Sequence, residues 1–139
     1  MEPKRTALRS LDPEAKARMQ AAMQAQARER DARIGELPAI RLEGEAALRR
    51  LLPIAQRDTG QSSVLAWFLL SLYNGGRFPL DLTDLRRLDY ELFDDCMAVL
   101  KMDFQPAKEV HRYFEDGGAK WEALAKEWRF KDYPGSTWR

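Results

Sequence analysis

Acidic side chains are the densest group of chemically active residues in this 139-residue sequence. They are Asp84, Asp89, Glu91, Asp94 and Asp95, and on a helix Glu91, Asp94 and Asp95 would share one face because they lie three and four residues apart. Carboxylate oxygens suit Mg²⁺ or Ca²⁺, but calcium sites usually use a loop with a glycine turn, and this stretch contains no glycine. We therefore expect no metal site, and interpret the cluster as a solvated helix face or a surface that meets arginines of a partner.

Other groups suited to catalysis are few. His111 is the only histidine and Cys96 the only cysteine, which excludes a two-histidine metal motif, an intrachain disulfide and a zinc site built on thiolates. No Gly-x-Ser-x-Gly or Ser-x-x-Lys signature accompanies His111. Cys96 falls on an apolar helical stripe, which is typical of an inert buried thiol. We expect a protein that is not an enzyme and that has no catalytic residues and no cofactor.

Arginine outnumbers lysine by 16 to 7, and arginine favours forked contacts with carboxylates and phosphates. Four arginines are interleaved with glutamines near the N-terminus, where they could follow a nucleic-acid backbone. Acidic residues lie among them. These four arginines are Arg18, Arg28, Arg30 and Arg33.

Helices must position most of these groups. Asp12 followed by Pro13 predicts a helix start, Gly35 predicts its end, and Pro38 predicts extended chain over 37–42. The resulting helix, 13–33, has only a thin stripe of alanine and methionine. Such a helix stands in solvent, docks on a partner or pairs with a second copy.

Residues 37–130 hold the larger apolar side chains. Helices are predicted over 45–58 with a break or kink at Pro53, over 64–73, over 81–102, from Pro106 to Gly117, and over 119–130. The helix over 64–73 is apolar nearly all round, which predicts a central helix with Trp67 buried. In the helix over 81–102, a core stripe is predicted from Leu85, Leu88, Leu92, Cys96 and Val99, widened by Phe93, Met97 and Leu100. The sequence predicts an all-α fold, a compact bundle of five to six helices with an additional N-terminal helix.

Composition divides the chain into a polar N-terminal helix or arm (1–36), a helical core domain (37–130) and a flexible tail (131–139) with Tyr133 and Trp138 as interaction residues. The formal net charge is +1, which excludes a supercharged nucleic-acid binder. Charge is not spread evenly, because residues 81–103 hold 3 basic and 7 acidic side chains. The helix predicted there therefore presents an acidic face.

No export or membrane segment is visible. The basic start of the chain is followed by no apolar stretch, and the longest apolar run, 64–70, is far shorter than the roughly 20 residues of a membrane span. We expect a cytoplasmic protein that does not bind membranes.

Residues 51–63 and 68–89 resemble a small uncharacterised domain family carried by proteobacterial plasmids, integrative conjugative elements and prophages. The most specific pieces are Tyr73-Asn74-Gly75 and Asp81-Leu82-Thr83-Asp84-Leu85, and the similarity covers about 45–130. The resemblance carries no assigned activity. It implies an accessory protein of a mobile genetic element that binds another protein, host-defence components included, or assists DNA maintenance and transfer.

We therefore predict a non-enzymatic accessory protein that acts by protein–protein interaction, as a regulator or inhibitor of a host or element machine such as a defence system. The predicted binding surface consists of Asp84, Glu91, Asp94 and Asp95. The alternative is a nucleic-acid-binding accessory factor that uses the four N-terminal arginines. The oligomeric state stays open, self-association through the N-terminal helix included.

Overall fold

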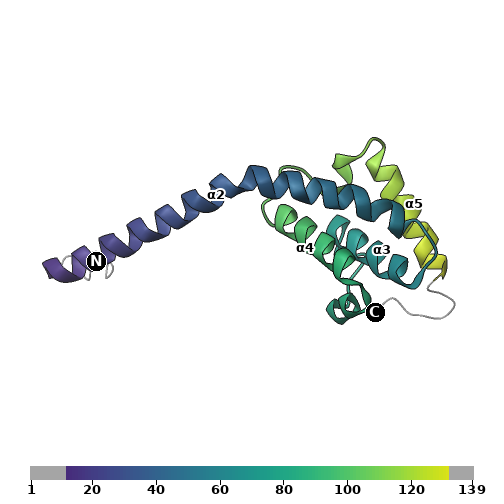
Figure 1. Cartoon of the computed structure of the whole chain (residues 1–139), viewed down its shortest axis with the longest axis horizontal. Coiled ribbons are helices and arrows are strands. Elements are labelled where there is room, and N and C mark those ends of the chain that lie inside the picture. Colours follow the sequence, from purple (N-terminus) through teal and green to yellow (C-terminus); the bar gives the residue numbers. More distant parts are fainter. Residues whose placement is uncertain (1–11, 132–139) are drawn as a thin grey trace, which may run out of the picture. The chain divides into compact units, whose positions relative to one another are not determined.

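The computed structural model of the chain describes residues 12–131, with side chains through residue 128. The predicted tail with Tyr133 and Trp138 lies outside the described side chains. Within the described part the fold is all-α, as predicted, and contains no strand. The elements, drawn in Figure 1, are α2 (Pro13–Ala55), α3 (Gly60–Tyr73), the 3-10 helix η1 (Leu82–Arg87), α4 (Tyr90–Phe104), the 3-10 helix η2 (Val110–Tyr113) and α5 (Gly117–Lys131). No helix among these residues has both the length and the apolar character of a membrane span.

The chain separates into two compact units, Met1–Leu37 and Pro38–Arg139. In the first unit, the described residues are 12–37, of which 13–37 form the N-terminal part of α2. All their side chains are exposed except Ala15, Ala27 and Leu37, which are partly buried. The first unit therefore has no hydrophobic core of its own in its described part.

Helix α2 begins where the sequence predicts, because Asp12 Oδ1 accepts a hydrogen bond from the Ala15 amide at 2.6 Å. The predicted stop at Gly35, the extended segment over 37–42 and the break at Pro53 are wrong, since α2 continues to Ala55. A glycine weakens a helix by only about 1 kcal/mol, and a proline removes one backbone donor. Burial of one face of α2 in the second unit offsets these costs, and that face consists of Gly44, Ala47, Leu48, Leu51, Leu52 and Ala55.

Helix α3 is the central helix of the second unit, as its apolar sequence predicts. Thr59 caps its start by accepting a hydrogen bond from the Ser62 amide at 3.0 Å, and Asn74 ends it. Trp67 was predicted to be buried, but it is only partly buried, with its ring centroid 6.1 Å from that of Phe78. Helix α5 packs against α3, and the indole of Trp121 donates a hydrogen bond to the Leu69 carbonyl at 3.1 Å.

Residues 81–104 form two elements where the sequence predicts one helix. Asp81 caps η1 through the Thr83 amide at 3.0 Å, and Asp89 caps α4 through the Leu92 amide at 2.9 Å. An aspartate that accepts from a backbone amide two or three residues ahead favours a new helix start over continuation. The helix predicted from Pro106 to Gly117 is also wrong, because this stretch holds only η2.

Gly117 begins α5 rather than closing a helix. A Cβ on this glycine would overlap the His111 carbonyl, so the backbone of α5 approaches η2 more closely than a side chain allows.

Candidate functional site

The outward face of α4 carries a line of apolar side chains. We call it the α4 outer stripe, and it consists of Tyr90, Phe93, Met97, Leu100 and Phe104. Successive members lie three, four, three and four residues apart, the spacing that keeps side chains on one side of a helix. Tyr90 is 89% exposed, Phe104 85%, Phe93 38% and Leu100 37%, and Met97 is partly buried.

The exposure of two stripe residues contradicts part of the core predicted from the sequence. Phe93 and Leu100 were predicted to widen the core face of this helix, but both are exposed. Cys96 and Val99 are buried as predicted, Met97 packs against the core, and Met102 completes the buried face of α4. Helix α4 therefore has a second apolar line besides its buried face, which is exposed at four positions and packs against the core at Met97.

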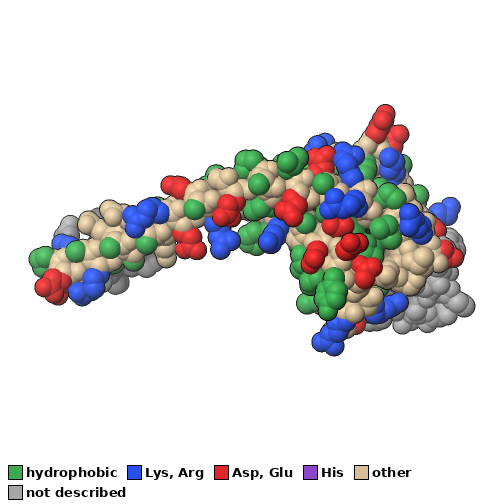
Figure 2. All heavy atoms as spheres, in the orientation of Figure 1, with side chains coloured by type: hydrophobic (Ala, Val, Ile, Leu, Met, Phe, Trp, Pro, Cys, Tyr) green, Lys and Arg blue, Asp and Glu red, His purple; other side chains and the backbone are tan. Residues whose placement is uncertain are grey.

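The predicted acidic surface lies partly beside this stripe. Glu91 and Asp94 are exposed on α4, and in Figure 2 acidic and hydrophobic side chains lie next to one another over α4. Asp84 lies apart from them, partly buried on η1. The structure thus brings together two of the four predicted residues in an exposed position.

Asp95, a member of the predicted binding surface, is paired with Arg50 of α2. The Arg50 guanidinium donates to both carboxylate oxygens of Asp95, at 2.8 and 3.1 Å. Hydrogen bonding to Asp95 and its negative charge raise the pKa of Arg50. Asp95 is therefore a contact between α2 and α4 within the second unit.

The acidic cluster does not gather into a metal site in the part of the chain that the structure describes. No group of three or more His, Cys, Asp or Glu side chains there is arranged to hold an ion. Asp89 has a structural role, because it caps α4 and its backbone amide donates to Gln61 Oε1 at 2.7 Å.

The four N-terminal arginines are all exposed on the first unit. A helix turns by about 100° per residue, so Arg28 and Arg30 point to opposite sides of α2. Glu29 and Asp31 stand between and after them. These arginines therefore do not form one continuous basic face.

Cys96 is fully buried and His111 is partly buried. Burial, with the negative charge of Asp95, raises the pKa of the Cys96 thiol to about 12, so the thiolate nucleophile is absent near neutral pH. The ring of His111 is partly buried and packs edge-on against Tyr73, with ring centroids 5.0 Å apart. Its Nδ1 atom is buried with no hydrogen-bond partner among the described residues.

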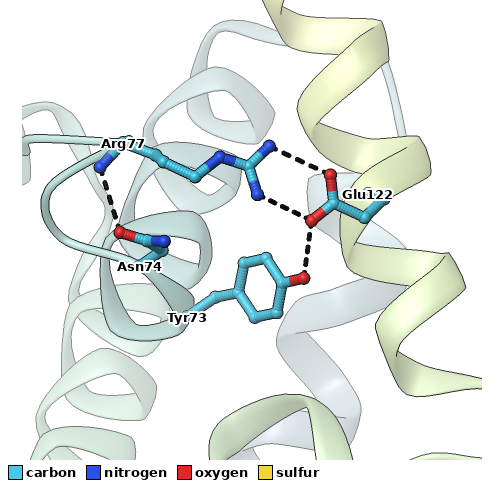
Figure 3. A network of polar contacts seen from close by, with 4 residues as sticks. All are labelled: Tyr73, Asn74, Arg77 and Glu122. Atoms are coloured by element: carbon cyan, nitrogen blue, oxygen red, sulfur yellow. Dashed lines mark hydrogen bonds and ion pairs between the residues drawn. The ribbon is translucent and has the colours of Figure 1, made fainter.

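A polar network that sequence reasoning missed joins the end of α3 to α5 (Figure 3). The guanidinium of Arg77 donates to both carboxylate oxygens of Glu122, at 2.8 and 3.0 Å, and the Tyr73 hydroxyl donates to the same carboxylate at 2.5 Å. Asn74 Oδ1 accepts from the Arg77 amide at 3.1 Å, which holds the turn that carries the arginine.

Hydrogen bonds explain the pKa shifts in this network. The hydrogen bonds from Arg77 and Tyr73 lower the pKa of Glu122 to about 2, and the hydrogen bond to Glu122 raises the pKa of Tyr73. The Arg77 guanidinium and the Tyr73 hydroxyl both donate to Glu122, and we call this network of Tyr73, Asn74, Arg77 and Glu122 the Glu122 clamp. Glu122 follows Tyr73 by 49 residues, and no local pattern in the sequence signals such a pairing.

Residues 45–129 match the model of DUF7673, a family of unknown function. This segment contains the whole α4 outer stripe and all four residues of the Glu122 clamp. The search of curated proteins and the search of solved structures both found no match to the chain.

Proposed function

We propose that this chain, which belongs to the family DUF7673, is a non-enzymatic protein-binding protein whose α4 outer stripe binds an amphipathic helix. In this proposal it is an accessory protein of a mobile genetic element that regulates or blocks a host or element machine, such as a defence system. The observation that carries the proposal is the helical line of five apolar side chains on α4, four of which are exposed.

The composition of the stripe supports a protein partner. Monomeric proteins rarely leave a contiguous apolar surface of this kind open to water. Aromatic residues and methionine are enriched at the centres of protein interfaces, and Tyr90, Phe93, Met97 and Phe104 are of these types. Anchors at steps of three and four residues are also the pattern by which one helix is recognised by another.

The charges beside the stripe define the chemistry of the partner helix. Asp94 and Lys101 lie seven residues apart, so they follow one line along α4. A fitting partner places a basic side chain opposite Asp94 and an acidic one opposite Lys101. Glu91 adds negative charge on the Asp94 side and would speed association with a basic partner surface.

The proposal narrows the predicted surface. Asp95 is paired with Arg50 and Asp84 is partly buried on another element, so neither contributes. The binding surface we propose consists of the α4 outer stripe with Glu91, Asp94 and Lys101.

Fluorescence anisotropy with designed peptides tests this proposal on the full chain. One helical peptide, as long as α4, carries an apolar stripe at the same spacing with the complementary charges, and a second has the same composition with the stripe scrambled. We expect only the first to bind, and Phe93→Asp to weaken binding about tenfold or more because a charge would enter an apolar contact. Leu82→Asp is the matched control, since Leu82 is exposed on η1, outside the stripe.

Two outcomes would contradict the proposal. One is equal binding of the two peptides. The other is unchanged binding by a Phe93→Asp variant whose circular dichroism and melting match the wild type.

Nucleic-acid binding through Arg18, Arg28, Arg30 and Arg33 remains the alternative. A mobility shift with duplex DNA that falls steeply with salt, and that is lost when these arginines are neutralised, would favour it.

A further inference from the structure

Four of the five members of the α4 outer stripe, all except Tyr90, match one another when two copies of α4 are placed antiparallel. We propose that the amphipathic helix it binds is α4 of a second copy of this chain, which makes the protein an antiparallel, two-fold symmetric homodimer. This inference rests on the proposed function, because it names the partner of the same surface.

Apolar layers of matching size form when two α4 helices are placed antiparallel. In heptad terms Tyr90, Met97 and Phe104 occupy the a positions, and Phe93 and Leu100 occupy the d positions. In antiparallel helix pairs an a side chain faces a d side chain of the other helix. One register then places Met97 against Leu100 of the second copy and Phe93 against Phe104 of the second copy. Two-fold symmetry forms each of these contacts twice.

The same register also pairs opposite charges. Asp94 and Lys101 occupy the two e positions of α4, and e positions face each other beside the apolar layers of an antiparallel pair. The register that joins Met97 to Leu100 brings Asp94 next to Lys101 of the second copy, again twice. A parallel pair would lack this match. In a parallel pair e positions face g positions, and the g positions of α4 are the buried Cys96 and the acidic Asp103.

The exposed apolar residues of the first unit offer a poorer surface for self-association. In the described residues 12–37 the large ones are Met19, Met23 and Ile34, which lie four and eleven residues apart and form no continuous line. The α4 outer stripe has five members and includes three aromatic rings. Pairing through α4 therefore buries more apolar surface than pairing through that part of α2.

The expected dimer is dissociable. Each copy contributes one helix of 15 residues, which is about 22 Å long, so the interface lies at the small end of the range for specific complexes. We expect a dissociation constant on the order of micromolar, with monomer and dimer in exchange.

Sedimentation equilibrium of the full chain over a range of concentrations tests the stripe. We expect a monomer–dimer equilibrium that Leu100→Asp shifts to monomer and that the control Leu82→Asp leaves unchanged. A dimer that persists in a folded Leu100→Asp variant would overturn the inference, because the copies would then pair through another surface.

Charge exchange tests the register. Asp94→Lys alone and Lys101→Asp alone each set like charges against each other twice, so each should weaken the dimer about tenfold. The variant that combines both substitutions should return close to wild-type affinity, which a merely misfolded protein would not do. A double variant as weak as the single ones would overturn the proposed pairing.

Disulfide formation between two single variants tests the orientation. We expect a mixture of Asp94→Cys and Lys101→Cys chains to form a mixed disulfide dimer on mild oxidation, and either variant alone to form little. Efficient cross-linking of Asp94→Cys with itself would overturn the antiparallel arrangement.

The peptide experiment separates this inference from the proposed function. A chain that stays monomeric at every concentration but still binds the stripe peptide overturns the homodimer and supports the proposed function. A monomeric chain that binds no peptide overturns both.

Discussion

Gly44 of α2 lies against Met102 of α4 with no room for a side chain between them. A Cβ placed on the glycine would come 2.5 Å from the Met102 Cβ and 3.0 Å from the Ala98 carbonyl oxygen. The face of α4 that carries Met102 therefore packs closely against α2, and the outer stripe lies on a different face of α4.

Gly44→Ala should destabilise the second unit. The added methyl group must displace the backbone of α2 or α4, and overpacking of this kind costs about 1–3 kcal/mol. A urea titration followed by circular dichroism would show a lower midpoint with the same slope. Gly35→Ala is the control, because a Cβ there meets nothing within 4 Å, and it should leave the midpoint unchanged or increase helicity. A Gly44→Ala variant that unfolds at the wild-type midpoint would contradict the close approach.

Substitutions at Asp95 and Asp94 should have different effects on folding stability and on peptide binding. Asp95→Asn removes the ion pair with Arg50. The Asp95 side chain is 17% exposed and the Arg50 side chain is 57% exposed, so the substitution should cost no more than about 1 kcal/mol of folding free energy. It should leave stripe-peptide binding unchanged. Asp94→Asn should leave the folding free energy unchanged and weaken binding. Denaturant titrations and fluorescence anisotropy on the two variants measure the folding free energy and peptide binding. If Asp95→Asn weakened peptide binding and Asp94→Asn did not, Asp95 would belong to the binding surface.

Glu122 should make stability depend on pH in the acid range. Its pKa is lowered to about 2 in the folded state, against an ordinary value of 4.5, by the hydrogen bonds from Arg77 and Tyr73. A carboxylate whose pKa is lower in the folded state stabilises the fold above about pH 4.5 and loses this contribution as the pH falls toward 2. Melting temperatures measured across this range should fall more steeply for the wild type than for Glu122→Gln. Because Glu122 is half exposed, we expect a modest difference, and parallel curves would exclude the clamp.

Two tryptophans should differ in their contribution to stability. Trp121 is fully buried and donates to the Leu69 carbonyl, so Trp121→Ala should cost about 3–5 kcal/mol. Trp67 is only partly buried, so Trp67→Ala should cost less. Thermal or urea unfolding of the two variants measures the difference, and an equal loss would mean that Trp67 is as enclosed as Trp121.

Local patterns in the sequence determined the fold class and several helix ends. Asp12 followed by Pro13 predicted the start of α2, and the helix predicted over 64–73 ends at the same residue as α3. The continuous apolar composition of α3 predicted its central position. These features are local, because caps, turns and apolar periodicity act within a few residues of the chain.

Only the tertiary structure decided where α2 ends and which face of α4 is open. Helix α2 passes through Pro38 because its later turns bury a face in the second unit, a gain that local propensity does not contain. On α4, the line through Cys96 and Val99 and the line through Phe93 and Leu100 are both apolar at helical spacing. The sequence alone cannot show which of two such faces is buried, because burial depends on which neighbouring helix packs against each face. Gly44 lets α2 approach Met102 on the first face, and the second face stays exposed to whatever binds it.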